Sequence, residues 1–268
     1  MRSLDHYPNE RMPVVPATAG RHVTPTPWTT RQMIVGALAT LIPWIAFNLT
    51  VNAMFGSTKT SSAPTPPALD IAAGVAVFIF AALLEAIFLI APLAIINSRR
   101  LPRARFRERL RWLGFRATPL APALLTIIVA TAIGLGGSLL YSQAISYFHW
   151  PIQTNSDTLL LEGKAAPFTT VGLLASAAIV APFCEEIFFR GLVFVGLLKR
   201  MPLWSAALIS AIVFGIAHVD LGSLAPLIII GLALAWVRWR TDSIWPGIFV
   251  HAINNTVAAL VLLPLLFK

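Results

Sequence analysis

The sequence has little charge, a single cysteine and no apolar run at its amino end. Only 12% of its 268 residues are charged and 57% are hydrophobic, whereas about 25% of the residues in a typical soluble domain are charged. The mean hydropathy is +0.78. This composition excludes an ordinary soluble domain and indicates a membrane protein with several spans. The lone Cys184 excludes an intrachain disulfide.

The first thirty residues lack the apolar run of about 7–15 residues that a signal peptide needs. They are polar and rich in proline, and they carry Arg2, Arg11 and Arg21. Such a composition favours a disordered tail. We therefore expect residues 1–30 to form a disordered cytoplasmic tail.

Long apolar stretches fill the rest of the chain, and most are long enough to cross a bilayer as helices. They cover 32–55, 69–97, 118–147, 167–198, 202–219, 223–237 and 244–267. We therefore predict an all-α fold, a polytopic transmembrane helical bundle of about seven spans with eight as the alternative. This domain would occupy residues 31–268.

The net charge of +9 would suit nucleic acid binding, but the bases lie in short segments beside the spans. The block 98–116 holds eight arginines and is wedged between two spans. It favours an amphipathic helix at the membrane surface, with Phe106, Leu110 and Leu113 toward lipid. Most bases fall on the side of the amino terminus, which predicts that this terminus is cytoplasmic.

Two adjacent acids interrupt the fourth apolar stretch. Glu185 and Glu186 lie in A-P-F-C-E-E-I-F-F-R-G, and no other charge occurs from 165 to 184. Glu186 and Arg190 are spaced to pair on one helix face, whereas Glu185 points about 100° away from Glu186. We expect Arg190 to neutralise Glu186 and Glu185 to face a cavity. A purely structural buried ion pair is the alternative.

Three further polar residues lie at compatible depths in later spans. His218 ends F-G-I-A-H in the fifth stretch, and His251 and Asn255 share a helix face in the seventh. A glutamate and a histidine together can activate water, and a histidine and an amide can stabilise an oxyanion. The set suits hydrolysis of a peptide bond within the membrane. Taken singly, each residue would be explained by a hydrogen bond between helices.

A zinc ion held by Glu185, His218 and His251 would activate water as well. The chain has no H-E-x-x-H motif, which counts mildly against zinc. It also has no G-x-S-G motif, because Ser138 is followed by Leu139. This disfavours an intramembrane serine protease.

The three motifs together resemble those of the CAAX-protease and bacteriocin-processing family of intramembrane proteases. The family patterns E-E-x-x-x-R, F-x-x-x-H and H-x-x-x-N occur in this order at 185–190, 214–218 and 251–255. They lie on three spans within a catalytic core that we place at 167–260.

The resemblance implies a role for each motif residue. Glu185 would activate the water, assisted by His218, while His251 and Asn255 would stabilise the oxyanion. The Glu186–Arg190 pair would support them, and Phe214 would only pack. The family has been described both as glutamate-dependent and as metal-dependent. We expect no required cofactor, with Zn²⁺ as the alternative.

The resemblance also bears on the substrate. Eukaryotic relatives trim three residues from prenylated CAAX proteins, and bacterial relatives include proteins of peptide maturation and bacteriocin immunity. The arginine- and alanine-rich composition indicates a GC-rich bacterium. We expect a membrane-associated protein or peptide as substrate, the lipid bilayer of a bacterial plasma membrane as surroundings, and no nucleic acid partner. The sequence does not indicate an oligomeric state.

Two other classes of function stay open. A transporter or proton relay would use Glu85, Glu185 and Glu186 as titrating sites, and a non-catalytic scaffold would use them only for packing. Neither needs Asn255 one turn from a histidine. Glu85, the lone acid of the second stretch, suits a structural hydrogen bond and a proton or substrate contact equally.

Overall fold

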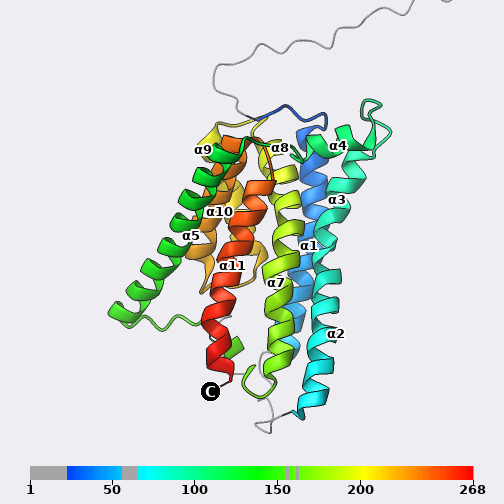
Figure 1. Ribbon diagram of the computed structural model, residues 1–268. Helices are drawn as coiled ribbons and strands as arrows, with labels where there is room; N and C mark the ends of the chain where they lie inside the picture. Colours follow the sequence, from blue (N-terminus) through cyan, green and yellow to red (C-terminus); the bar gives the residue numbers. More distant parts are fainter. Residues whose placement is uncertain (1–22, 56–64, 155–156, 158, 161–162, 268) are drawn as a thin grey trace, which may run out of the picture.

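The computed structural model describes residues 23–55, 65–154, 157, 159–160 and 163–267, and these residues form helices without any strand (Figure 1). The predicted all-α bundle is confirmed. The longer helices are α1 (Thr30–Phe55), α2 (Pro67–Glu85), α3 (Ile87–Ile96), α5 (Leu120–Phe148), α7 (Pro167–Phe188), α9 (Leu203–Ala217), α10 (Leu224–Thr241) and α11 (Trp245–Leu266). The shorter ones are α4 (Phe106–Trp112), the π-helix η1 (Phe189–Phe194) and α8 (Val195–Leu197).

Among the described residues, six segments are long and apolar enough to cross a membrane, so the protein is an integral membrane protein. Two of these segments are composite, since α2 and α3 meet at Ala86 and α7 runs through η1 into α8. The predicted span at 202–219 differs, because α9 has only 15 residues. Its length of about 22 Å is less than the ~30 Å of a hydrocarbon core. The hairpin of α9 and α10 therefore ends part-way down the bundle (Figure 1).

The central helix is α7, which packs against α2 and α3 on one side and against α11 on the other (Figure 1). Glycines allow α2 and α7 to touch through their backbones. A Cβ on Gly172 would lie 2.0 Å from the carbonyl oxygen of Gly74, and a Cβ on Gly74 would lie 2.3 Å from that of Phe168. Small residues of this kind are typical of close helix packing in membranes.

An aspartate fixes the start of α7 to the first turn of α2. The carboxylate of Asp70 accepts hydrogen bonds from the backbone N–H groups of Phe168, at 2.8 Å, and Thr169, at 2.9 Å. The Thr169 hydroxyl donates a third, at 2.6 Å. A negative charge is also favourable at the amino end of a helix. Asp70 therefore has a structural role, and both of its carboxylate oxygens accept hydrogen bonds.

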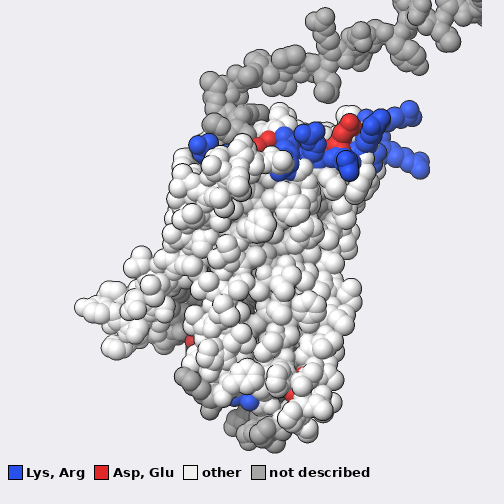
Figure 2. Space-filling model, in the orientation of Figure 1, with Lys and Arg blue, Asp and Glu red and all other residues white. Residues whose placement is uncertain are grey.

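Basic residues gather at one end of the molecule, around α4 (Figure 2). Phe106 is exposed there, as expected of an interfacial helix, but Leu113 is fully buried with its backbone against Gly191. The prediction that Leu113 faces lipid is wrong, because α4 ends at Trp112 and Gly114 turns the chain inward. Gly114 has a φ of +101°, which favours glycine.

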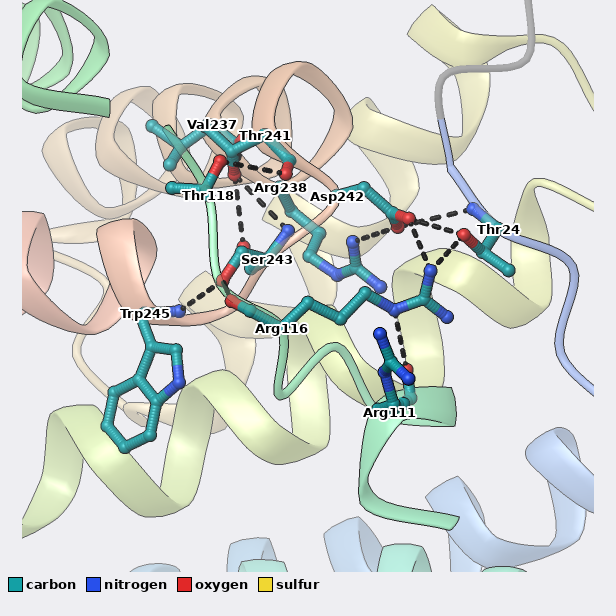
Figure 3. Close-up of polar contacts among 10 residues, drawn as sticks. All are labelled: Thr24, Arg111, Arg116, Thr118, Val237, Arg238, Thr241, Asp242, Ser243 and Trp245. Carbon is teal, nitrogen blue, oxygen red and sulfur yellow. Dashed lines mark hydrogen bonds and ion pairs between the residues drawn. The ribbon is translucent and has the colours of Figure 1, made fainter. Parts of the chain in front are cut away.

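Four residues at the basic end are held together by one carboxylate (Figure 3). Asp242 accepts hydrogen bonds from Arg238, at 2.8 Å, from Arg116, at 2.7 Å, and from Thr24. Burial raises the pKa of Asp242, but the hydrogen bonds from Thr24 and Arg238 and the two arginine charges outweigh it. The pKa therefore lies below its ordinary value. We call these four residues the Asp242 cluster.

The chain before α1 also belongs to this end. Lys199 donates hydrogen bonds to the carbonyl oxygens of Thr26, at 2.6 Å, and Trp28, and the Trp28 side chain is fully buried. These contacts attach Thr26 and Trp28 to the bundle, and the disordered tail at 1–30 stays a prediction. Residues 1–22 of this predicted tail lie outside the described residues.

Candidate active site

The predicted ion pair lies where α7 passes into η1. Arg190 Nη1 is 2.8 Å from Glu186 Oε1, and both side chains are fully buried. Arg190 Nη2 donates to the carbonyl oxygen of Gly231 in α10, at 3.1 Å. The pair that the i, i+4 spacing predicts is present, and it ties α7 to α10. A π-helical turn at this place fits a functional site, where such turns are frequent.

The ring of Phe214 packs against three polar residues of the site. Its centroid lies 4.5 Å from Arg190 Cζ, 4.6 Å from the His218 ring centroid and 5.5 Å from the His251 ring centroid. An arginine over an aromatic ring is stabilised by the ring quadrupole. Phe214 is fully buried, so it acts as a packing residue that spaces the two histidines.

Glu185 points away from the ion pair and toward both histidines. Its Oε2 lies 4.0 Å from Nε2 of His218 and 3.9 Å from Nε2 of His251. His218 Nδ1 is 2.8 Å from the carbonyl oxygen of Phe214. Because a carbonyl only accepts, Nδ1 carries the proton and Nε2 is left with its lone pair. A water about 2.8 Å from both atoms can bridge Glu185 and His218.

His218 owes its place to the reversal between α9 and α10. It directly follows the last residue of α9, and Val219 after it has a φ of +51°. A positive φ is strained for a β-branched residue, and such strain is concentrated at functional sites. The indole of Trp44 in α1 donates to the carbonyl oxygen of Ala217, at 2.8 Å. The turn is thereby fixed from a third helix.

His251 of α11 lies between the two acids. Its Nδ1 is 3.5 Å from Glu186 Oε1, and its Nε2 is the atom close to Glu185. One turn earlier, Gly247 leaves room for the Glu186 carboxylate, since a Cβ there would lie 2.7 Å from Glu186 Oε2. The glycine thus lets α11 approach the ion pair closely enough for His251 to reach Glu185.

Asn255 lies one turn further along α11. Its Nδ2 donates to the carbonyl oxygen of Ala177 in α7, at 2.8 Å. A carboxamide nitrogen has two N–H groups, so this hydrogen bond uses one and orients the side chain. The contribution of Asn255 to an oxyanion site stays a prediction.

A cavity of about 110 Å³ opens beside Glu185 and His218. It is lined by Trp44, Asn48, Glu85, Phe88, Glu185, Phe189, Ala217 and His218. The expectation that one acid is neutralised by arginine while the other faces a cavity is confirmed. Since a water molecule takes roughly 30 Å³ of liquid volume, the cavity has room for several.

Half of this lining comes from α1, α2 and α3, outside the predicted core 167–260. Glu85 ends α2 and lines the cavity next to the predicted catalytic acid. The position of Glu85 within an apolar stretch marked it as a candidate functional residue in the sequence. The sequence could not show that it shares a cavity with Glu185. Trp44 and Asn48 carry no such signal, because α1 is uncharged beyond Arg31 and matches no motif.

The zinc alternative can be tested on distances. Ligand atoms about 2.0–2.1 Å from a tetrahedral zinc ion are about 3.4 Å apart, whereas Glu185 is 3.9–4.0 Å from His251 and His218. Within the described ranges, no three His, Cys, Asp or Glu side chains are grouped closely enough to hold a metal ion. These three residues would have to move closer together to bind zinc. Both the metal-free and the zinc alternative stay predictions.

Comparison with known proteins gives a family match in the second half of the chain and one curated relative. Residues 167–257 match the family described as type II CAAX prenyl endopeptidase Rce1-like. The chain is 34% identical over 124 residues to YdiL of Bacillus subtilis (strain 168), named as a candidate membrane peptidase. The match covers 44% of this chain and 49% of YdiL, so the chain spans about half the length of this relative. No solved structure matches the chain significantly.

Proposed function

We propose that the protein is an intramembrane endopeptidase, because residues 167–257 match the CAAX-protease family whose patterns the three motifs resemble. One structural observation supports this proposal most strongly. Glu185 and His218 come from separate helices and line one cavity within an apolar bundle. Nε2 of His251, from a third helix, lies 3.9 Å from Glu185 Oε2.

The proposed reaction begins with a water held between Glu185 Oε2 and His218 Nε2. Glu185 takes a proton from this water as the water oxygen bonds to the carbonyl carbon of the substrate. The negative charge that develops on the carbonyl oxygen is stabilised by His251 and Asn255. The C–N bond then breaks, and the leaving nitrogen takes up the proton from Glu185. The water has been added across the peptide bond.

The Glu186–Arg190 pair supports this chemistry without taking part in it. Glu186 lies close to His251 Nδ1, and Arg190 reaches α10 through Gly231. The pair therefore ties α10 to α7 and places the Glu186 carboxylate 3.5 Å from His251 in α11. Positioning of this kind is required because small displacements in a catalytic site cost a large part of the rate.

We assign the substrate to membrane-associated peptides and proteins, with prenylated CAAX-type proteins as one class among them. The site lies inside helices that are apolar enough to cross a membrane. Bases gather at the end that carries α4 (Figure 2). The positive-inside rule then puts that end, with the amino terminus, in the cytoplasm, and the composition points to a bacterial plasma membrane.

The test is cleavage of a library of membrane-associated peptides by detergent-purified protein, read by mass spectrometry. We expect the wild type to cleave and Glu185→Gln to lose at least 100-fold in rate, since a general base contributes about 10²–10⁴-fold. The variant should elute and unfold as the wild type does. A wild type that cleaves no peptide would favour the relay or the scaffold.

The same assay with a strong chelator tests the metal. Activity that persists after metal removal supports direct activation of water by Glu185. Activity that is lost and then restored by zinc would assign Glu185, His218 and His251 to a zinc site.

A further inference from the structure

Glu85 lies in the same cavity as Glu185, although it is outside the segment that matches the protease family. It is the last residue of α2, and the chain turns at Ala86 before α3 begins. The mechanism above gives it no part. A carboxylate inside a membrane-spanning segment is costly and usually functional.

Aromatic packing fixes the position of Glu85. Phe88, three residues further on, is 1% exposed. Its ring centroid lies 4.8 Å from that of Trp44, 5.2 Å from that of Phe188 and 5.6 Å from that of Phe189. This cluster holds the junction of α2 and α3 against α7 and η1. The carboxylate of Glu85 is therefore held at the cavity by the fold and not by a polar partner.

Two carboxylate oxygens at this cavity lack a hydrogen-bond partner among the described residues, Oε2 of Glu85 and Oε2 of Glu185. Glu185 is 6% exposed. A buried oxygen without a donor is expensive, and a catalytic site uses such an oxygen when a substrate supplies the donor. The contrast with Asp70 on the same helix is direct, since that carboxylate accepts three hydrogen bonds.

The arrangement of helices shows which substrate donor would reach Glu85. The helix that carries Glu185 lies between α11 on one side and the pair α2 and α3 on the other (Figure 1). The predicted oxyanion donors are on α11. A scissile carbonyl oxygen that points to α11 leaves the amide nitrogen on another side of the carbonyl carbon, where it can face the wall that contains Glu85.

We propose that Glu85 is a catalytic residue that accepts a hydrogen bond from the scissile amide N–H and stabilises the leaving nitrogen. The inference rests on the proposed peptidase function. The nitrogen takes the proton from Glu185 and is positively charged as long as it stays bonded to the carbonyl carbon. When the C–N bond breaks, its electron pair stays on nitrogen and the amine leaves neutral. The carboxylate of Glu85 interacts with the scissile nitrogen more strongly in the transition state than in the ground state, which accelerates the reaction. Glu85 itself gains and loses no proton.

The test compares a peptide with its ester analogue, in which oxygen replaces the scissile N–H. An ester has no N–H to donate, and its leaving oxygen offers no positively charged N–H group to Glu85. We expect Glu85→Gln to lower kcat for the peptide about 10-fold and Glu85→Ala up to about 100-fold, with KM nearly unchanged. The rate on the ester should stay within about twofold of the wild type. The unfolding temperature of Glu85→Gln should be unchanged or higher, because an unpartnered buried charge is removed.

Asp70→Asn is the matched control on the same helix. It should lower the unfolding temperature and leave kcat unchanged for both substrates, since Asp70 is structural. Equal losses on peptide and ester in the Glu85 variants, or no loss on either, would overturn the inference while leaving the peptidase intact. A wild type that cleaves neither substrate would overturn the proposed function and the inference with it.

Discussion

In the described part of the chain, two arginines are almost completely buried, and each pairs with a carboxylate one helical turn away. Arg190 pairs with Glu186 in the site, and Arg238 pairs with Asp242 at the basic end, both at 2.8 Å. The surroundings of the two carboxylates differ. Glu186 is 0% exposed, whereas Asp242 is 21% exposed and shared with Arg116 and Thr24.

The difference separates an ion pair that supports a reaction from one that fastens an end of the bundle. Charges desolvated on both sides are costly, and removing one leaves the other without compensation. The Glu186–Arg190 pair is desolvated in this way, and it lies next to His251 and Glu185. In the Asp242 cluster, the side chains of Asp242 and Arg116 are reached by water, so these two charges are partly solvated and screened, whereas Arg238 is buried. We expect the first pair to respond far more strongly to substitution.

The largest effect is expected from Glu186→Gln. Arg190 would lose its charge partner in a dry site, which costs roughly 3–5 kcal/mol. Folded yield and unfolding temperature in detergent should both fall sharply, and peptidase activity with them. A Glu186→Gln protein that expresses and unfolds like the wild type would contradict the expectation that this pair is more sensitive to substitution than the Asp242 cluster.

A smaller effect on the same pair is expected from Gly247→Ala. The added Cβ would lie 2.7 Å from Glu186 Oε2, and the carboxylate would have to shift between Arg190 and His251. Overpacking of this kind costs about 1–3 kcal/mol. The rate of peptide cleavage per folded molecule should fall as well. Gly136→Ala is the control, because a Cβ there meets nothing within 4 Å, and only that variant should keep the wild-type rate.

At the basic end, Asp242→Asn should have a moderate effect. It weakens the hydrogen bonds to Arg238, Arg116 and Thr24, which is expected to cost about 1–2 kcal/mol. The unfolding temperature should fall modestly, and activity per folded molecule should be unchanged. A loss of activity in the folded variant would show that the cluster communicates with the site.

The smallest effect is a pH dependence of the same cluster. The folded pKa of Asp242 lies below its ordinary value of 3.8, so its contribution to stability is complete above that value and is lost as the pH falls through the folded pKa. The unfolding temperatures of the wild type and Asp242→Asn should therefore converge below about pH 3.8. A constant difference between them across this range would contradict the lowered pKa.

The sequence was informative where a local pattern carried the information. Apolar runs located the spans, and charges within such runs identified Glu185, Glu186 and Arg190. The i, i+4 spacing predicted that Glu186 and Arg190 pair. The rotation of about 100° per residue predicted that Glu185 points elsewhere, because helix geometry is fixed. The predicted span at 202–219 ran two residues past the end of α9, because the sequence gives no sign that the helix ends at Ala217, before the positive φ of Val219.

Contacts between distant segments were beyond local patterns. The cavity wall from α1 to α3 depends on the packing of Phe88 against aromatic residues of other helices. Trp44 could not be identified as a lining residue, because a tryptophan in an apolar helix is common. Leu113 fitted a lipid-facing pattern, but the turn at Gly114 carries it into the core. The composition of residues 23–29 gave no sign that Lys199, far along the chain, donates hydrogen bonds to Thr26 and Trp28.

The central claim is that Glu185 activates the water that cleaves a peptide bond. The most direct measurement is the cleavage rate of Glu185→Gln at saturating concentration of a peptide that the wild type cleaves, with the unfolding temperature recorded in parallel. The account predicts a rate at least 100-fold lower at an unchanged or higher unfolding temperature. A variant that cleaves as fast as the wild type would contradict it.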